Sequence, residues 1–171
     1  MTQIILNMSL SVDGFIAAES GDSAFALETL KKDTLFNNFY ESVDSIVIGR
    51  RTYDYLKQNA PKMLKEKHIF VITHYLRQQE GNAVFIHENI AKTLNELKKN
   101  ASKNIWLFGG AQAANVLLKE GLVDQMILTT APVLLGNGIR LFDEEGDLQN
   151  LKLEESRTFD GYVQNRYTFA K

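Results

Sequence analysis

The sequence predicts an α/β fold, a three-layer α/β/α sandwich around a mixed, mainly parallel central sheet. Strand-like apolar runs alternate with segments of helical periodicity over most of the 171 residues, which is typical of parallel strands joined by helices. Near the end of the chain, the pair Asp160-Gly161 separates two strand-like runs, a pattern that favours a tight hairpin. We therefore expect the last two strands to form an antiparallel hairpin at one edge of the sheet.

The first half of the chain alternates between the two kinds of element. Apolar runs predict strands at Ile4–Ser9, Phe15–Ala18, Ser45–Ile48 and Ile69–Thr73. Helical spacing of apolar residues predicts helices at Phe25–Tyr40 and Thr52–Gln58. Charged residues stand between the apolar ones of the longer helix, so one edge of it could face a pocket.

The second half continues the alternation. Strands are expected at Ala83–Ile86, Ile105–Phe108, Gln125–Ala131, Leu151–Phe159 and Tyr162–Phe169, and helices at Ile90–Asn100 and Ala111–Glu120. Asn89 stands where an N-cap is expected, and Gly121 follows the last expected helix as its C′ residue. Pro132–Phe142 is expected to be a loop packed near a subunit contact or the rim of a pocket.

The composition limits the class of protein. A chain of 171 residues with 44% hydrophobic residues can form one domain with a proper core, so we expect a single domain over residues 1–171. Its net charge of −2 gives no basic field for nucleic acid, and no stretch approaches the roughly 20 apolar residues of a membrane span. The first residues lack the features of a secretory signal, and a chain without cysteine fits a reducing compartment. A soluble, cytoplasmic protein is the expectation.

The sequence gives little support for a metal site or for a catalytic nucleophile. His68, His74 and His87 lack the short spacing of a zinc site, and no Gly-x-Ser-x-Gly motif indicates a serine nucleophile. The absence of cysteine excludes thiol chemistry. What remains is a site in which a bound cofactor would carry the reaction.

Two glycines follow one of the expected buried strands. In Asn104–Gln112, the run Ile105–Phe108 leads into Gly109-Gly110 and then into small residues that begin a helix. A backbone without side chains lets a ligand come close, and the free N–H groups at a helix start suit a phosphate. A tight turn without a ligand is the alternative for this segment taken alone.

A second strand also ends on glycine. Gly49 follows Ser45–Ile48, and Arg50, Arg51 and Thr52 stand in the turn that leads into the next helix. Two guanidinium groups and a hydroxyl at a helix N-terminus suit a pyrophosphate, through charge-assisted hydrogen bonds and the helix dipole. A solvated basic turn is the alternative, but two such turns in one small domain favour a dinucleotide.

A third strand ends on groups that could meet a ribose or its phosphate. Thr73 and His74 lie at the end of the run Ile69–Thr73, and Arg77 follows three residues later. For His74, an ordinary position in a loop without a ligand is an equally good interpretation.

Together these pieces resemble a known family. Four segments carry the resemblance, in the family's order and at plausible spacing: 7–17 (NMSLSVDGFIA), 49–53 (GRRTY), 106–111 (WLFGGA) and 131–142 (APVLLGNGIRLF). They are similar to bacterial dihydrofolate-reductase-like proteins, including the reductase domain of bifunctional riboflavin-biosynthesis deaminase/reductases. The resemblance covers essentially the whole chain, whereas the zinc-binding deaminase half has no counterpart.

The resemblance implies a dihydrofolate reductase-like fold and an NADPH-dependent oxidoreductase. The residues that it implies for NADPH are Leu10, Ile16, Ala17, Gly49, Arg50, Arg51, Thr52, Thr73, His74, Phe108, Gly109, Gly110, Ala111 and Gln112. The two glycine segments would hold the pyrophosphate, the residues after Ile72 the adenosine end, and those around the first strand the nicotinamide. Arg50 and Arg51 of the second segment would supply positive charge at the 2′-phosphate, which is a reason to expect NADPH over NADH. Whether Arg77 joins them at that phosphate stays open. Thr129 matches a threonine that faces the substrate pocket.

The acidic residues leave the proton donor open. Folate reductases hold the pterin with a carboxylate at the first helix, after a tryptophan-proline segment that this chain lacks. Asp22 falls in the loop ahead of the expected helix, whereas Glu28 and Asp33 fall within it, where we expect exposed side chains. Asp13 falls in a Val-Asp-Gly turn, which its side chain is expected to cap. The catalytic candidates are therefore Asp22, Asp33, Glu28 and Asp13, with a bound water as a further proton source.

Three functions stay open. The first is hydride transfer to a C=N or C=O bond of a small heterocyclic or ribosylaminopyrimidine-like substrate, with the protein orienting the reactants and excluding water. The second is a folate-type (dihydrofolate) reductase, which requires a buried carboxylate. The third is a non-catalytic nucleotide-binding or oligomeric protein, because fold alone does not fix function. A homodimer would suit the apolar segment Pro132–Phe142, although burial within one chain is equally consistent.

Overall fold

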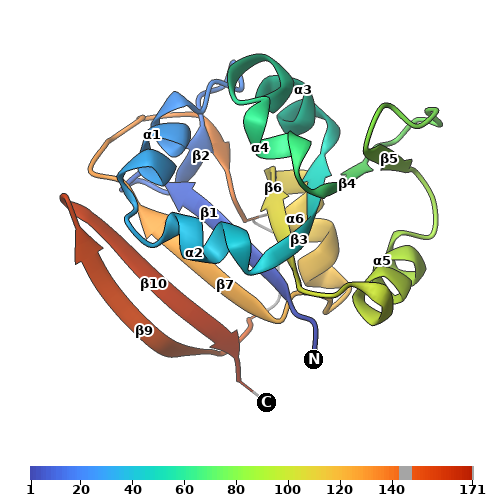
Figure 1. The fold of residues 1–171 in the computed structure, drawn as a ribbon. Helices are drawn as coiled ribbons and strands as arrows, with labels where there is room; N and C mark the ends of the chain where they lie inside the picture. The colour runs from blue at the N-terminus through green and yellow to red at the C-terminus, as the bar shows by residue number, and fades with distance from the viewer. Residues whose placement is uncertain (143–147, 171) are drawn as a thin grey trace.

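The computed structural model describes residues 1–142 and 148–170 (Figure 1). An eight-stranded sheet forms its centre, in the order β5-β4-β3-β6-β1-β7-β10-β9. These strands are β1 (Ile4–Leu10), β3 (Val43–Gly49), β4 (His68–Ile72), β5 (Ala83–Ile86), β6 (Asn104–Gly109), β7 (Gln125–Thr130), β9 (Leu151–Phe159) and β10 (Tyr162–Phe169). Neighbours from β5 to β7 are parallel, whereas β10 is antiparallel to both β7 and β9. The predicted mixed sheet with an antiparallel C-terminal hairpin is therefore confirmed.

Helices cover both faces of the parallel part of the sheet (Figure 1). On one face lie α1 (Ala24–Lys32), α2 (Phe36–Glu41), α3 (Arg50–Asn59) and α4 (Lys62–Lys65), and on the other lie α5 (Ile90–Asn100) and α6 (Ala111–Lys119). Alternating residues of one strand serve both layers, because successive side chains of a strand point to opposite faces. In β3, Ile46 and Ile48 pack with α1–α4, whereas Val47 packs with α5 and α6.

The connections between the parallel strands leave the sheet in two directions. The path β3-α3-β4 runs toward the β5 edge over one face, and β6-α6-β7 runs toward the hairpin over the other. Helices on opposite faces are what right-handed crossovers in opposite directions require. The strands β3 and β6 are neighbours, so a topological switch point lies at their carboxyl ends, where open α/β sheets bind ligands.

The single helix predicted at Phe25–Tyr40 is wrong, because the chain breaks into α1 and α2 at Asp33. Asp33 has extended backbone angles and ends α1. Its carboxylate accepts a hydrogen bond from Leu35 N at 2.9 Å, and its carbonyl accepts one from Phe36 N at 3.1 Å. Aspartate competes with helix hydrogen bonds in this way, which an apolar periodicity does not reveal.

Two further elements were not predicted. The short helix α4 follows Pro61, and a strand β8 (Ile139–Arg140) lies within the predicted loop Pro132–Phe142. β8 pairs antiparallel with β2 (Phe15–Ala17), which forms a small second sheet.

The predicted helix-end residues lie where the sequence placed them. Asn89 occupies the N-cap of α5, although its side chain makes no capping hydrogen bond, and Gly121 follows α6 at a positive φ of 63°. Among the described residues, no helix is long and apolar enough to cross a membrane.

Candidate functional site

The two glycine segments of the sequence meet at the switch point. Ile48 pairs with Gly109 across β3 and β6, which brings the ends of these strands side by side. A Cβ placed on Gly110 would lie 3.0 Å from Thr52 Oγ1, and one on Gly49 would lie 3.4 Å from Gly110 N. We call the segments Gly49–Thr52 and Gly109–Gln112 together the glycine crevice.

Each segment of the glycine crevice begins a helix without a cap. Gly49 and Gly110 are the N-cap residues of α3 and α6, and neither helix has a side-chain cap or an acidic residue in its first turn. The first N–H groups of both helices therefore have no partner within their helices and carry the positive ends of two helix dipoles. Gly109 has φ +102° and its peptide bond to Gly110 is cis, while the Met8 side chain fills the space where a Cβ would stand. Two helix N-termini side by side suit a diphosphate.

The strand β2, which follows the turn after β1, lies against the glycine crevice. The Ile16 Cδ1 atom lies 3.8 Å from the Cβ position of Gly110, which puts β2 against the glycine crevice. Leu10 ends β1 at the same edge of the sheet, beside Thr130 of β7, and Ala17 is buried. Phe108 packs on Trp106, with ring centroids 4.6 Å apart. The structure thus brings Ile16, which was predicted for the nicotinamide, against a residue predicted for the pyrophosphate.

The predicted cationic residues surround the start of α3. Arg50 forms an ion pair with Asp54 at 3.0 Å, and the exposed Arg51 has no ion pair with any described residue. The Arg77 guanidinium lies 5.5 Å from the ring centroid of Phe85, against which Tyr53 of α3 packs edge-on. Arg77 therefore flanks the same helix as the other two arginines.

Thr73 and His74 follow β4, the strand beside β3. Gly49 pairs with Ile72, so Thr73 comes directly after the partner of a crevice residue. Thr73 is buried, and its hydroxyl accepts a hydrogen bond from Tyr75 N at 3.3 Å, whereas His74 is exposed. The side chain of Thr73 thus supports its own turn.

Two of the four acidic candidates lie on the surface. The Asp22 carboxylate accepts hydrogen bonds from Ala24 N at 3.0 Å and from the Tyr55 hydroxyl at 3.2 Å, which ties the loop before α1 to α3. Glu28 is exposed, as predicted, and forms an ion pair with Lys31 at 3.6 Å.

Asp13 accepts a hydrogen bond within its own turn, from Ser11, and also connects that turn to a second loop, which the sequence did not predict. Its carboxylate accepts hydrogen bonds from Gly136 N at 2.7 Å and from Leu135 N at 3.2 Å. A hydrogen bond from Ser11 and these two backbone bonds lower the pKa of Asp13 to about 2. The turn that joins β1 to β2 is thereby anchored to the loop that leads to β8.

Asp33 is not exposed as predicted, because it lies in a buried polar network that joins α1 to the hairpin. Arg157 Nη2 lies 2.6 Å from Asp33 Oδ1, and Gln164 Nε2 donates to Asp33 Oδ2 at 3.1 Å. Only 7% of the Asp33 side chain and 19% of the Arg157 side chain are exposed. Gln164 also donates to Thr129 Oγ1 at 2.8 Å and accepts from Arg157 Nε at 2.9 Å. We call these four residues the hairpin network.

The sequence did not single out Arg157 or Gln164. Both lie on strands of the hairpin, where they pair directly with one another. The alternation of side chains in Leu151–Phe159 could have placed Arg157 on one face of its strand. Which residues Arg157 contacts depends on how β7, β10 and α1 are arranged in space, and one sequence does not determine that arrangement.

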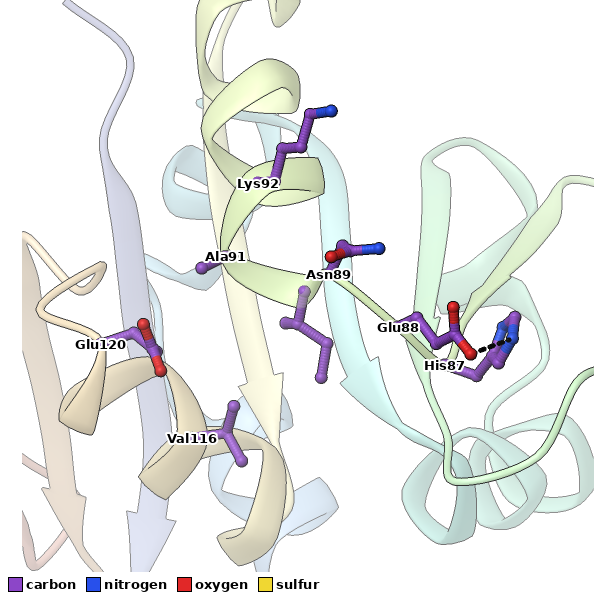
Figure 2. Close-up of a pocket in the computed structure, with 8 residues that line it drawn as sticks. His87, Glu88, Asn89, Ala91, Lys92, Val116 and Glu120 are labelled. Carbon is purple, nitrogen blue, oxygen red and sulfur yellow. Dashed lines mark ion pairs between the residues drawn. The ribbon is translucent and has the colours of Figure 1, made fainter.

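A separate hollow lies between the start of α5 and the side of α6. Figure 2 shows the residues that line it: His87, Glu88, Asn89, Ile90, Ala91, Lys92, Val116 and Glu120. None of them is a predicted site residue. His87 and Glu88 face one another across 3.6 Å, and the hollow is a separate feature from the glycine crevice.

Comparison with known proteins identifies relatives along the whole chain. Residues 2–164 match the family model of the RibD C-terminal domain. YyaP of Bacillus subtilis (strain 168) is 34% identical over 178 residues, which cover 96% of this chain and 94% of YyaP. YwjB of the same organism is 34% identical over 169 residues, which cover 97% of each chain.

Solved structures share the fold. A crystal structure from Shewanella sp. PV-4 superposes with a TM-score of 0.85 at 24% identity and 99% coverage of both chains. RibD of Acinetobacter baumannii gives a TM-score of 0.76 at 17% identity, with 99% of this chain matched to 58% of that one. Dihydrofolate reductase of Enterococcus faecalis, complexed with NADP(H) and RAB-propyl, gives a TM-score of 0.73 at 14% identity, covering 99% of this chain and 97% of that one. The fold is therefore that of the reductases, as predicted, and the chain belongs to the family of the RibD C-terminal domain.

Proposed function

We propose that this protein is an NADPH-dependent reductase that transfers a hydride to a small heterocyclic or ribosylaminopyrimidine-like substrate. The observation that carries the proposal is the glycine crevice, in which two uncapped helix N-termini meet at the switch point of a reductase-type sheet. An anion with two phosphates satisfies both sets of N–H groups at once.

The residues of the glycine crevice fit NADPH. A side chain on Gly110 would crowd Thr52, and without one the backbone there allows a ligand to come close. The crevice segments would hold the pyrophosphate, and Arg51 would meet the 2′-phosphate because its guanidinium is exposed and without an ion pair among the described residues. When bound, NADPH supplies the hydride.

The chain's own groups would orient the reactants and exclude water. Ile16 and Leu10 present apolar surface beside the glycine crevice, and Asp13 anchors the turn between them. Thr129 of β7 lies two strands from β6 along the sheet, where the resemblance implies the substrate pocket, and its hydroxyl accepts a hydrogen bond from Gln164. Three of the carboxylates, those of Asp13, Asp22 and Asp33, already accept two or more hydrogen bonds. This supports a bound water as the proton source.

A folate-type reductase is the second candidate, and one observation favours it. The sequence left in doubt a buried carboxylate, and Asp33 is one. Its neutralisation by Arg157 counts against the capture of a cationic ring, because the carboxylate has its counter-ion already. Dihydrofolate therefore belongs in the test as a discriminating substrate.

The proposal extends to the location, the substrate class and the oligomeric state of the protein. A reductase that draws on NADPH would work in the cytoplasm on a small molecule. We also propose that the protein acts as a homodimer.

The test is a titration of the purified protein with NADPH and with NADH, followed by calorimetry, and then a screen for cofactor oxidation. We expect tighter binding of NADPH and oxidation with ribosylaminopyrimidines or related heterocycles. Binding without oxidation by any heterocycle or by dihydrofolate would favour the non-catalytic alternative. No binding of either nucleotide at millimolar concentration would contradict the proposal.

A further inference from the structure

Two polar side chains of the central strand β1 are buried without a partner. Only 7% of Asn7 and 5% of Ser9 is exposed, and neither side chain makes a hydrogen bond with any described residue. Buried amide and hydroxyl groups are nearly always paired, because an unpaired one loses its bonds to water and gains none in return. Two such groups on one strand indicate that a ligand completes them.

Asn7 and Ser9 lie on the face of β1 against which α1 packs. Ile5 pairs with Trp106, which belongs to the core beneath α1, α2 and α3. Alternate residues of a strand share a face, so Asn7 and Ser9 point to the same side as Ile5. Ser9 pairs in register with Thr129 of β7, so polar side chains continue across two neighbouring strands. We call Asn7, Ser9 and Thr129 the polar strip.

The polar strip begins where β1 and β6 separate. These two strands pair as far as Leu6 and Leu107, whereas the pairing of β1 with β7 continues to Leu10. The Asn7 carbonyl accepts a hydrogen bond from the Trp106 side chain at 3.1 Å. Beyond Leu107, β6 leads into the glycine crevice. The polar strip therefore lies between the glycine crevice on one side and the hairpin network on the other.

The polar tips of Asn7 and Ser9 keep a small contact with solvent. In the described part of the chain, Arg166 Nε is the one side-chain polar atom that has no hydrogen bond and is also fully closed to solvent. The amide of Asn7 and the hydroxyl of Ser9 are therefore not fully closed, although the rest of each side chain is buried. The two groups are open to a ligand at their tips.

The charged groups on this face already have counter-ions. Asp33 is paired with Arg157, and Arg166 forms an ion pair with Glu155 at 3.6 Å. Arg157 and Arg166 share the face of Thr129 because their strands pair in register across β10 and β7. Neither a phosphate nor a cationic ring would find an unpaired counter-charge in these groups. The polar strip itself is neutral, so it fits a neutral ligand.

We infer that the polar strip recognises the substrate of the reductase, and that this substrate is a neutral heterocycle with a lactam edge and no phosphate group. The inference rests on the proposed function, because it names the molecule that the bound cofactor would reduce. A side-chain amide donates and accepts, so Asn7 matches the C=O and N–H of a lactam with two hydrogen bonds. The Ser9 hydroxyl adds a third, as a donor or as an acceptor.

Urea denaturation of the free protein tests whether Asn7 is kept for a ligand. Asn7→Leu removes a buried polar group that has no partner, so we expect the midpoint to rise. Ser9→Ala is a second variant with the same expected direction. The matched control is Asn115→Leu, because Asn115 is also 7% exposed but donates to Ala111 O at 2.8 Å and to Leu141 O at 2.7 Å. We expect this control to lower the midpoint. Equal losses in the two leucine variants would assign Asn7 to the core and overturn the proposal.

Uridine and uridine 5′-monophosphate test the class of ligand, because they share a lactam edge and differ by a phosphate. Both are titrated into the ¹⁵N-labelled protein, free and with NADPH, and followed by NMR. We expect uridine to shift the side-chain amide signals of Asn7, and Asn7→Leu to weaken its binding about tenfold or more. The phosphate is expected to bring no gain in affinity. No shift at Asn7 up to about 20 mM uridine, or a monophosphate bound about tenfold or more tightly than uridine, would overturn the proposal.

These outcomes separate the polar strip from the proposed activity. Denaturation uses the free protein, so its result does not depend on NADPH. Binding of NADPH without a response of Asn7 to uridine would overturn the role of the polar strip and leave the reductase standing. A failed titration with NADPH would instead contradict the proposed activity itself.

Discussion

The glycine crevice and the hairpin network lie near the same carboxyl edge of the sheet and use polar groups in opposite ways. In the glycine crevice, the helix N–H groups have no side-chain cap and no acidic residue in the first turn, so they are left to a ligand. In the hairpin network, Asp33, Arg157, Gln164 and Thr129 satisfy one another and are nearly closed to solvent. Unpaired polar groups indicate binding, whereas mutually paired buried groups hold elements together. The two regions should therefore respond differently to substitution.

The largest expected effect is on stability, in the hairpin network. Arg157→Met leaves the Asp33 carboxylate buried without its counter-ion, so we expect a loss of about 3 kcal/mol in the free energy of unfolding. Urea denaturation measures it, and the affinity for NADPH is expected to stay unchanged. Lys152→Met, which removes an exposed ion pair of the same hairpin, is the matched control and should change stability little. Equal losses in the two variants would contradict a buried network.

The next effect is on binding, in the glycine crevice. Gly110→Ala places a methyl group 3.0 Å from Thr52 Oγ1, in the space proposed for the pyrophosphate, so we expect NADPH to bind about tenfold or more weakly. Calorimetry measures the affinity. The control is Gly81→Ala, at a positive φ in open space, which should cost stability but leave binding intact. Unchanged affinity in the Gly110 variant would remove that residue from the site.

A smaller effect is expected on the preference for NADPH over NADH. Arg51→Ala is expected to weaken NADPH about tenfold and to leave NADH nearly unaffected, because only NADPH carries the 2′-phosphate. The ratio of the two dissociation constants is the measurement. Lys62→Ala, an exposed cation on α4, controls for general charge. An equal loss of affinity for both cofactors would contradict the assignment of Arg51 to the 2′-phosphate.

The smallest effect depends on pH. The pKa of Asp13 is lowered from 3.8 to about 2, so its contribution to stability is present above pH 4 and is lost as the pH falls through 2. The difference in melting temperature between wild type and Asp13→Ala should stay constant from pH 7 to about pH 4. It should then shrink toward pH 2. A difference that already disappears near pH 5 would show that Asp13 does not carry it.

The sequence predicted the crevice because its signals are local. Glycine after a buried strand and cations at the start of a helix are read from a few consecutive residues, as in Gly49–Thr52 and Gly109–Gln112. That the two segments are neighbours followed from the resemblance, and the pairing of Ile48 with Gly109 places them side by side.

The hairpin network was out of reach of the sequence because its partners are distant. Asp33 and Arg157 are 124 residues apart, and their contact requires α1 to end at Asp33 and β10 to lie between β7 and β9. Apolar periodicity extended the helix through Asp33, since it carries no information on a side chain that competes for backbone hydrogen bonds. For the same reason Asp33 was expected on the surface.

The most direct test of the central claim maps NADPH onto the backbone. Amide chemical shifts of the ¹⁵N-labelled protein are recorded by NMR with and without NADPH. We expect little change at Arg157 and Gln164, and the largest shifts in the two crevice segments, at Gly49, Arg50, Arg51, Thr52, Gly109 and Gly110. Shifts centred on the hollow between α5 and α6, or no shifts at millimolar NADPH, would contradict it.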